Sequence, residues 1–129
     1  MARYAFGKNV ATSYEETLQR ATAALAAEGF GVLTEIDVQA TLKKKLNLER
    51  PPYKILGACN PQFAARALEI EPQIGALLPC NVIVRKDDGG KTVVEFMDPN
   101  AVLQLVGRPE IGTIAAEVRA RLERVMAAL

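Results

Sequence analysis

Two cysteines, Cys59 and Cys80, have the most reactive side chains in this sequence, and they stand in similar surroundings. Each lies at one end of an apolar, strand-like stretch, next to an asparagine or a proline. Asp98 ends a further such stretch and also precedes a proline. A thiolate can act as a nucleophile, and a nearby carboxylate can orient a reacting group or handle a proton. Any chemistry in this chain would therefore start from these three residues.

The composition excludes several kinds of catalysis. Histidine is absent, which excludes Ser-His and Cys-His nucleophile pairs and every zinc site that contains histidine. The two cysteines do not form a C-x-x-C pair. Two thiols and one carboxylate also fall short of the four ligands of a structural zinc site. We therefore expect no metal and no cofactor, and we favour a binding module over an enzyme.

The order of the predicted strands brings the three residues together. A D-D-G-G sequence predicts a hairpin turn between strands 81–85 and 92–97. The start of the first strand and the end of the second then meet, so Cys80 and Asp98 should be neighbours. Cys59 ends the preceding strand, and it reaches the same place if that strand is antiparallel to its neighbour. The ligand-binding residues predicted there are Cys59, Asn60, Pro61, Pro79, Cys80, Asn81 and Asp98.

Two helices should begin at this same end of the sheet. Asn60-Pro61 and Asp98-Pro99 each combine an N-cap residue with a proline at the first helical position. The free N–H groups and dipole of a helix start favour an anion and would activate a nearby thiol such as Cys59. The same residues are also typical of ordinary capping, and a cysteine at a strand end is often a small buried apolar residue. Both interpretations stay open at this point.

The rest of the pattern predicts an α+β fold in which helices cover one face of a mainly antiparallel sheet. Ser13 begins a capping box, and Gly29 ends the helix that follows. A helix after Asp37 places three apolar residues on one face: Val38, Leu42 and Leu46. The C-terminal helix has roughly 17 residues and is about 25 Å long, enough to cross a small sheet. With no repeat and no linker, residues 1–129 should form a single domain.

Charge and hydropathy limit the partners and the location. The chain has 16 basic and 15 acidic residues, and neither half forms a basic arm, so binding to nucleic acid has little support. There is no N-terminal leader pattern and no apolar run near 20 residues long. We therefore expect a soluble protein of the cytoplasm with no membrane contact, in which both thiols stay reduced.

The segments that carry the candidate residues resemble those of domain-of-unknown-function family 302, DUF302. The resembling segments are Ala58-Cys59-Asn60-Pro61, Leu77-Leu78-Pro79-Cys80-Asn81-Val82 and Met97-Asp98-Pro99. The resemblance covers almost the whole chain. It implies a two-layer fold similar to the TATA-binding-protein arrangement, with helices on one face of an antiparallel sheet. It implies no reaction, and fold similarity alone does not imply DNA binding.

Three functions remain compatible with the sequence. The first is a homodimeric module that holds a small ligand, an anion or a thiol-reactive molecule, at the Cys59/Cys80/Asp98 end of the sheet. The second is a thiol-dependent enzyme or sulfur carrier that uses Cys59 or Cys80. The third is an interaction domain without a pocket. Both faces of the two hairpin strands are apolar, which favours a homodimer and therefore the first or third function.

Overall fold

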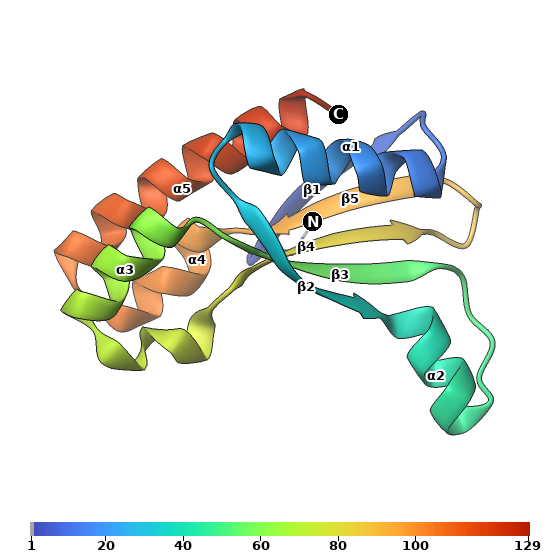
Figure 1. Ribbon diagram of the computed structural model, residues 1–129, viewed down its shortest axis with the longest axis horizontal. Helices are drawn as coiled ribbons and strands as arrows, with labels where there is room; N and C mark the ends of the chain where they lie inside the picture. The colour runs from blue at the N-terminus through green and yellow to red at the C-terminus, as the bar shows by residue number, and fades with distance from the viewer. Residues whose placement is uncertain (1) are drawn as a thin grey trace.

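An antiparallel sheet of five strands forms the centre of the computed structural model, which describes residues 2–129 (Figure 1). The order of the strands across the sheet is β1-β5-β4-β3-β2. Every neighbouring pair is antiparallel. The strands are β1 (Ala5–Val10), β2 (Gly31–Asp37), β3 (Tyr53–Cys59), β4 (Cys80–Lys86) and β5 (Thr92–Met97). The predicted hairpin therefore exists as β4 and β5 at the middle of the sheet.

The helices lie on one side of this sheet, which confirms the predicted α+β class. The α-helices are α1 (Tyr14–Ala27), α2 (Val38–Leu46), α3 (Pro61–Ile70), α4 (Pro99–Val102) and α5 (Pro109–Ala127). Two 3-10 helices are η1 (Pro72–Leu77) and η2 (Leu103–Val106). Helices α1 and α5 lie along the sheet, whereas α3, α4 and η1 gather beyond one end of the strands (Figure 1). Helix α2 lies near the other end.

Short polar side chains begin four of the helices, as their sequence positions predict. The Ser13 hydroxyl accepts a hydrogen bond from the Glu16 N–H of α1 at 3.1 Å. Asp37, Asn60 and Asp98 cap α2, α3 and α4 in the same way. Gly29 has a φ of 86° just after α1, a left-handed conformation that glycine adopts without a steric penalty. The chain can therefore turn there directly into β2.

The core lies between the sheet and α1 and α5. Alternate residues of the central strands face the helices, and their side chains are fully buried: Leu56, Val82, Val84, Val94 and Phe96. Helix α5 contributes a buried stripe that includes Ile111, Ile114, Val118, Leu122 and Val125. In contrast, α2 has no buried residue. Its Leu46 is 69% exposed, so α2 is not part of this core.

An isoleucine row crosses the other face of the sheet, opposite α1 and α5. The strand register places Ile36 beside Ile55 and Ile55 beside Ile83. On β5 the next position is Glu95, which pairs with Arg85 at 2.7 Å. Ile36 is 50% exposed. Within residues 2–129, no helix is long and apolar enough to cross a membrane.

Candidate functional site

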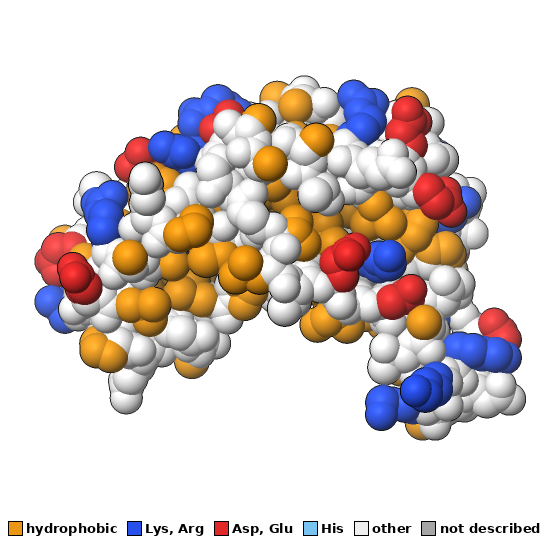
Figure 2. Space-filling model, in the orientation of Figure 1, with side chains coloured by type: hydrophobic (Ala, Val, Ile, Leu, Met, Phe, Trp, Pro, Cys, Tyr) orange, Lys and Arg blue, Asp and Glu red, His pale blue; other side chains and the backbone are white. Residues whose placement is uncertain are grey.

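A cavity of about 390 Å³ lies beside the ends of β3 and β4, where α3 and α5 cover them. Its lining is almost entirely apolar. The sheet and its connections contribute Phe30, Leu33, Thr34, Ala58, Cys59, Asn60, Leu78, Pro79 and Cys80. The helices and turns contribute Phe63, Ala64, Ala67, Leu68, Gly75, Leu103, Ile114 and Val118. Apolar side chains also gather on the outer surface over α3 and η1 (Figure 2).

Four of the seven residues predicted from the sequence line this cavity: Cys59, Asn60, Pro79 and Cys80. They meet because Ala58 of β3 pairs with Cys80 of the antiparallel strand β4, so the end of β3 lies beside the start of β4. Pro61 and Asn81 are exposed and do not line the cavity. Asn81 pairs with Gly57 on the opposite face of the sheet. The strand register therefore brings Cys59 and Cys80 to the same end of the sheet and directs Asn81 to the face opposite that of Cys80.

Asp98 also lies at this end of the sheet, but its carboxylate makes contacts outside the cavity. Its Oδ1 accepts a hydrogen bond from the Asn100 N–H at 2.9 Å, which caps α4. Its Oδ2 lies 2.7 Å from NH1 of Arg119 on α5. The Arg119 guanidinium in turn lies 3.7 Å from the centre of the Phe6 ring. Asp98 therefore caps α4 and pairs with α5, and through Arg119 it is also linked to β1. Both of its carboxylate oxygens already have a partner in the protein.

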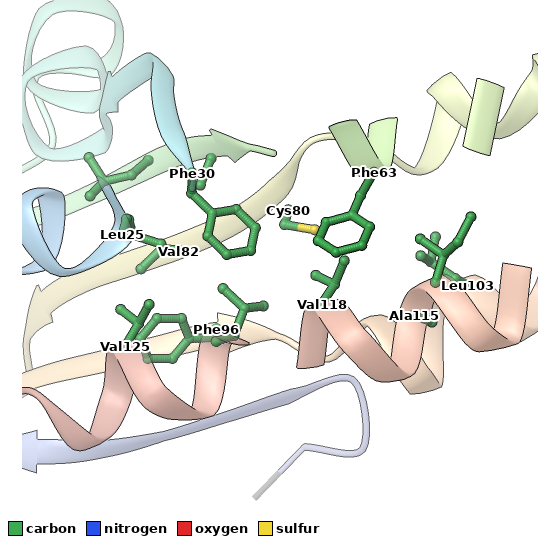
Figure 3. Packing of buried hydrophobic residues seen from close by; sticks show 14 of the residues in the cluster. Leu25, Phe30, Phe63, Cys80, Val82, Phe96, Leu103, Ala115, Val118 and Val125 are labelled. Atoms are coloured by element: carbon green, nitrogen blue, oxygen red, sulfur yellow. The ribbon is translucent and has the colours of Figure 1, made fainter. Parts of the chain in front are cut away.

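Cys80 is buried between aromatic rings. Figure 3 shows its side chain between Phe30 and Phe63, with Val118 of α5 close by. Cys80 is 7% exposed. Burial raises the pKa of its thiol to about 11, and the neighbouring Cys59 adds to this effect. At neutral pH the Cys80 thiol is therefore protonated, which makes it a poor nucleophile. Cys59 is partly exposed, and both cysteines are free thiols.

One rim of the cavity depends on the absence of a side chain at Gly57. A Cβ atom there would lie 2.2 Å from Oγ1 of Thr34 and 3.1 Å from Cγ of Pro79. Glycine therefore lets Thr34 and Pro79 close over β3. The register of β2 also shifts between Val32 and Thr34, and Leu33 at this bulge is 68% exposed. These β2 residues were absent from the sequence-based prediction.

Sequence reasoning also missed the aromatic and aliphatic part of the lining, because it comes from distant elements. Phe30 follows α1, Phe63 belongs to α3 and Leu103 to η2. Each of these positions fits an ordinary core pattern in the sequence. Gly29 and Phe30 follow α1 in the sequence, but this pair by itself does not indicate a cavity.

The electrostatics of the cavity are simple. Among the lining residues, all of which the structure describes, the two cysteines are the only ones with an ionisable side chain. Within residues 2–129, no group of three or more His, Cys, Asp and Glu side chains could hold a metal ion. The lining thus provides apolar surface, two thiols, the Thr34 hydroxyl and the Asn60 amide. Such a set can bind and orient a small molecule, but it contains no general base besides a thiol.

Comparison with known proteins gives the family. The family model described as "Domain of unknown function DUF302" matches residues 6–129. The chain belongs to the DUF302 family. A solved structure described as "uncharacterized conserved protein DUF302 from Bacillus stearothermophilus" is similar in fold, with a TM-score of 0.91. The two sequences are 33% identical over 98% of each chain. No curated protein matches this DUF302 chain.

Proposed function

We propose that this DUF302 protein is a binding module that holds a small, mainly apolar molecule in the cavity beside Cys59 and Cys80. The observation that supports this proposal is the cavity itself. Its volume, about 390 Å³, falls within the range of roughly 300–1,000 Å³ that is usual for small-molecule sites. Such sites combine a mainly apolar lining with a few polar groups, and here Asn60 and Thr34 supply them.

The arrangement of ionisable groups favours binding over catalysis. Acid–base catalysis needs a group that gains and loses a proton near neutral pH, within reach of the reacting atom. The Cys80 thiol has a pKa raised to about 11 by burial. The Asp98 carboxylate is held by Arg119 and by the start of α4. Neither residue is therefore prepared to transfer a proton to a molecule in the cavity.

A thiol-dependent enzyme or sulfur carrier is the second candidate. It is favoured by one observation, namely that Cys59 both lines the cavity and is partly exposed. The Cys59 thiol could add across an activated carbon–carbon double bond of a ligand, with its proton passing to the second carbon, or exchange with a ligand disulfide, whose other half would leave as a thiol. If Cys59 were the reactive thiol, Cys80 would only pack in the core.

We further propose that the protein acts as a homodimer through the isoleucine row formed by Ile36, Ile55 and Ile83. These side chains are adjacent across three strands on the face opposite α1 and α5. A contiguous apolar patch of this kind often marks an interface. A second copy fits because a twofold axis would place like rows against each other, and isologous dimers are the commonest oligomers.

Titration of the ¹⁵N-labelled protein with 1-octanol tests the binding function. We expect amide signals of cavity-lining residues, such as Ala58, Ala64 and Val118, to shift in a saturable way. Signals from exposed residues of α2 should not move. Shifts that are absent up to the solubility limit of octanol, or that scatter over the whole surface, would contradict the proposal.

A further inference from the structure

The polar residue most deeply buried at the cavity is Asn60, and half of its amide is unused. Asn60 is 8% exposed and lines the cavity. Its Oδ1 accepts a hydrogen bond from the Phe63 N–H at 3.4 Å, which caps α3. Within residues 2–129, the Asn60 side chain forms a hydrogen bond through Oδ1 alone, and its Nδ2 donates to no protein acceptor. Among the same described residues, the fully buried side-chain nitrogens without a partner are Nε of Arg50 and Nε of Arg121, so the Asn60 NH₂ group keeps some access and is free to donate to a molecule in the cavity.

A positive charge lies close to the same amide. A Cβ atom built on Gly29 would be 3.0 Å from Asn60 Nδ2 and 3.4 Å from NH1 of Arg121. Both donors therefore lie within 3.4 Å of the position that a Gly29 Cβ atom would occupy. The Arg121 guanidinium also lies 5.1 Å from the centre of the Phe63 ring, and Phe63 lines the cavity. Arg121 does not itself line the cavity, but its positive charge lies next to two residues that do, Asn60 and Phe63.

The charge of Arg121 is only weakly balanced. Its NH1 donates to the carbonyl oxygen of Glu28 at 2.9 Å, which is a neutral acceptor. Its NH2 is 3.8 Å from the carboxylate of Glu117, whose side chain is 52% exposed, and such surface pairs contribute little. The Nε of Arg121 is buried and has no hydrogen-bond partner among the described residues. The Glu28 carboxylate is directed to Arg124 instead, at 2.9 Å.

We propose that the ligand of this cavity is a small amphipathic carboxylate. Its apolar chain fills the cavity, and its carboxylate lies at the edge marked by Gly29. One carboxylate oxygen accepts a hydrogen bond from Asn60 Nδ2, and the negative charge pairs with Arg121. The proposal rests on the proposed function, because it requires the cavity to bind a ligand, and it adds the chemical class of that ligand.

Isothermal titration calorimetry with octanoate and 1-octanol separates the two claims. The probes share an apolar chain of the same length and differ in the headgroup. We expect the wild-type protein to bind octanoate about tenfold more tightly than octanol, since one charge-assisted hydrogen bond supplies at least that factor. Octanol measures whether the cavity binds an apolar chain, and the ratio of the two affinities measures the headgroup site.

Two variants and a matched control locate the headgroup. Asn60→Asp keeps a side-chain oxygen that can cap α3 and replaces the NH₂ donor with a second oxygen. Arg121→Gln removes the charge. Arg124→Gln removes a charge from the same helix at a side chain that is 57% exposed and pairs with Glu28. The first two variants should lose the preference for octanoate while still binding octanol, which also shows that they are folded. The third should keep it.

Each alternative outcome is decisive. Equal affinities for octanoate and octanol in the wild-type protein would overturn the carboxylate proposal and leave the cavity as an apolar binding site. No binding of either probe would overturn both proposals. A preference for octanoate that survives both Asn60→Asp and Arg121→Gln would overturn the assignment of the headgroup to these residues.

Discussion

Arg119 holds the carboxylate of Asp98 at 2.7 Å, and this ion pair connects α5 to the start of α4. Both side chains are largely shielded from solvent, with 25% and 17% of their side-chain surface exposed. The pair gives Asp98 a structural role at the end of the sheet where the sequence predicted a ligand. Its removal should therefore affect folding stability more than binding.

Asp98→Asn should lower the free energy of unfolding by about 1–2 kcal/mol. The amide oxygen can still cap α4, but the charge that pairs with Arg119 is lost. Glu123→Gln is a suitable control because Glu123 contacts the same Arg119 at 2.8 Å from a side chain that is half exposed. It should change stability by less than about 0.5 kcal/mol. Urea denaturation measures both variants, and an Asp98→Asn curve that coincides with wild type would contradict this role.

The two cysteines should differ in reactivity. Burial raises the pKa of Cys80 to about 11, so only roughly one molecule in ten thousand carries the Cys80 thiolate at pH 7. Cys59 is partly exposed. Iodoacetamide should therefore modify Cys59 first, as peptide mass spectrometry can show. Cys59→Ser should leave a protein that reacts only when it unfolds. Faster modification of Cys80 in the native protein would reverse this assignment and would favour Cys80 as the nucleophile.

Alkaline pH should destabilise the fold through two buried groups. Burial raises the pKa of Cys80 from 9.0 to about 11 and that of Tyr14 from 10.0 to about 12. In both cases the unfolded chain loses its proton at a lower pH than the folded chain. The free energy of unfolding therefore falls as the pH rises from about 9 through 11 for Cys80, and from about 10 through 12 for Tyr14.

Chemical denaturation between pH 8 and pH 12 measures this effect. The decline should be shallower in Cys80→Ala and in Tyr14→Phe than in the wild-type protein, whatever the stability of each variant at pH 8. Three parallel curves would show that neither ionisation is linked to folding.

The isoleucine row predicts the behaviour of the protein in solution. Light scattering at micromolar concentrations should give twice the chain mass of 14.0 kDa. Ile55→Lys should return the mass to that of one chain, because a charge in the middle of the row would have to be buried. Leu105→Lys replaces a leucine that is 75% exposed on η2 and should leave the dimer intact. A wild-type protein that is monomeric throughout would refute the dimer.

Local signals allowed much of the fold to be predicted. Ser13, Asp37, Asn60 and Asp98 each begin a helix as expected, because capping depends on residues only two or three positions apart. The D-D-G-G turn likewise fixed the β4–β5 hairpin and with it the neighbourhood of Cys80. In these cases, sequence neighbours determine the geometry.

Features that depend on tertiary packing could not be predicted in the same way. The apolar spacing in α2 predicted a helix, but the sheet ends before it, and Leu46 remains exposed. The Asp98 position was predicted, but the direction of its carboxylate depends on Arg119, which lies far away in the sequence. The cavity is a gap between separate elements, and periodicity within each element carries no information about such a gap.

The central claim is that a ligand occupies the cavity, and one pair of variants of α3 tests it most directly. Ala64 lines the cavity, whereas its neighbour Ala65 is exposed and does not. Ala64→Leu should fill part of the cavity and weaken octanol binding at least tenfold in calorimetry, without loss of thermal stability. Ala65→Leu adds the same side chain outside the cavity and should bind octanol like the wild-type protein. If a folded Ala64→Leu variant bound octanol with wild-type affinity, the ligand would have to bind elsewhere and the account would be wrong.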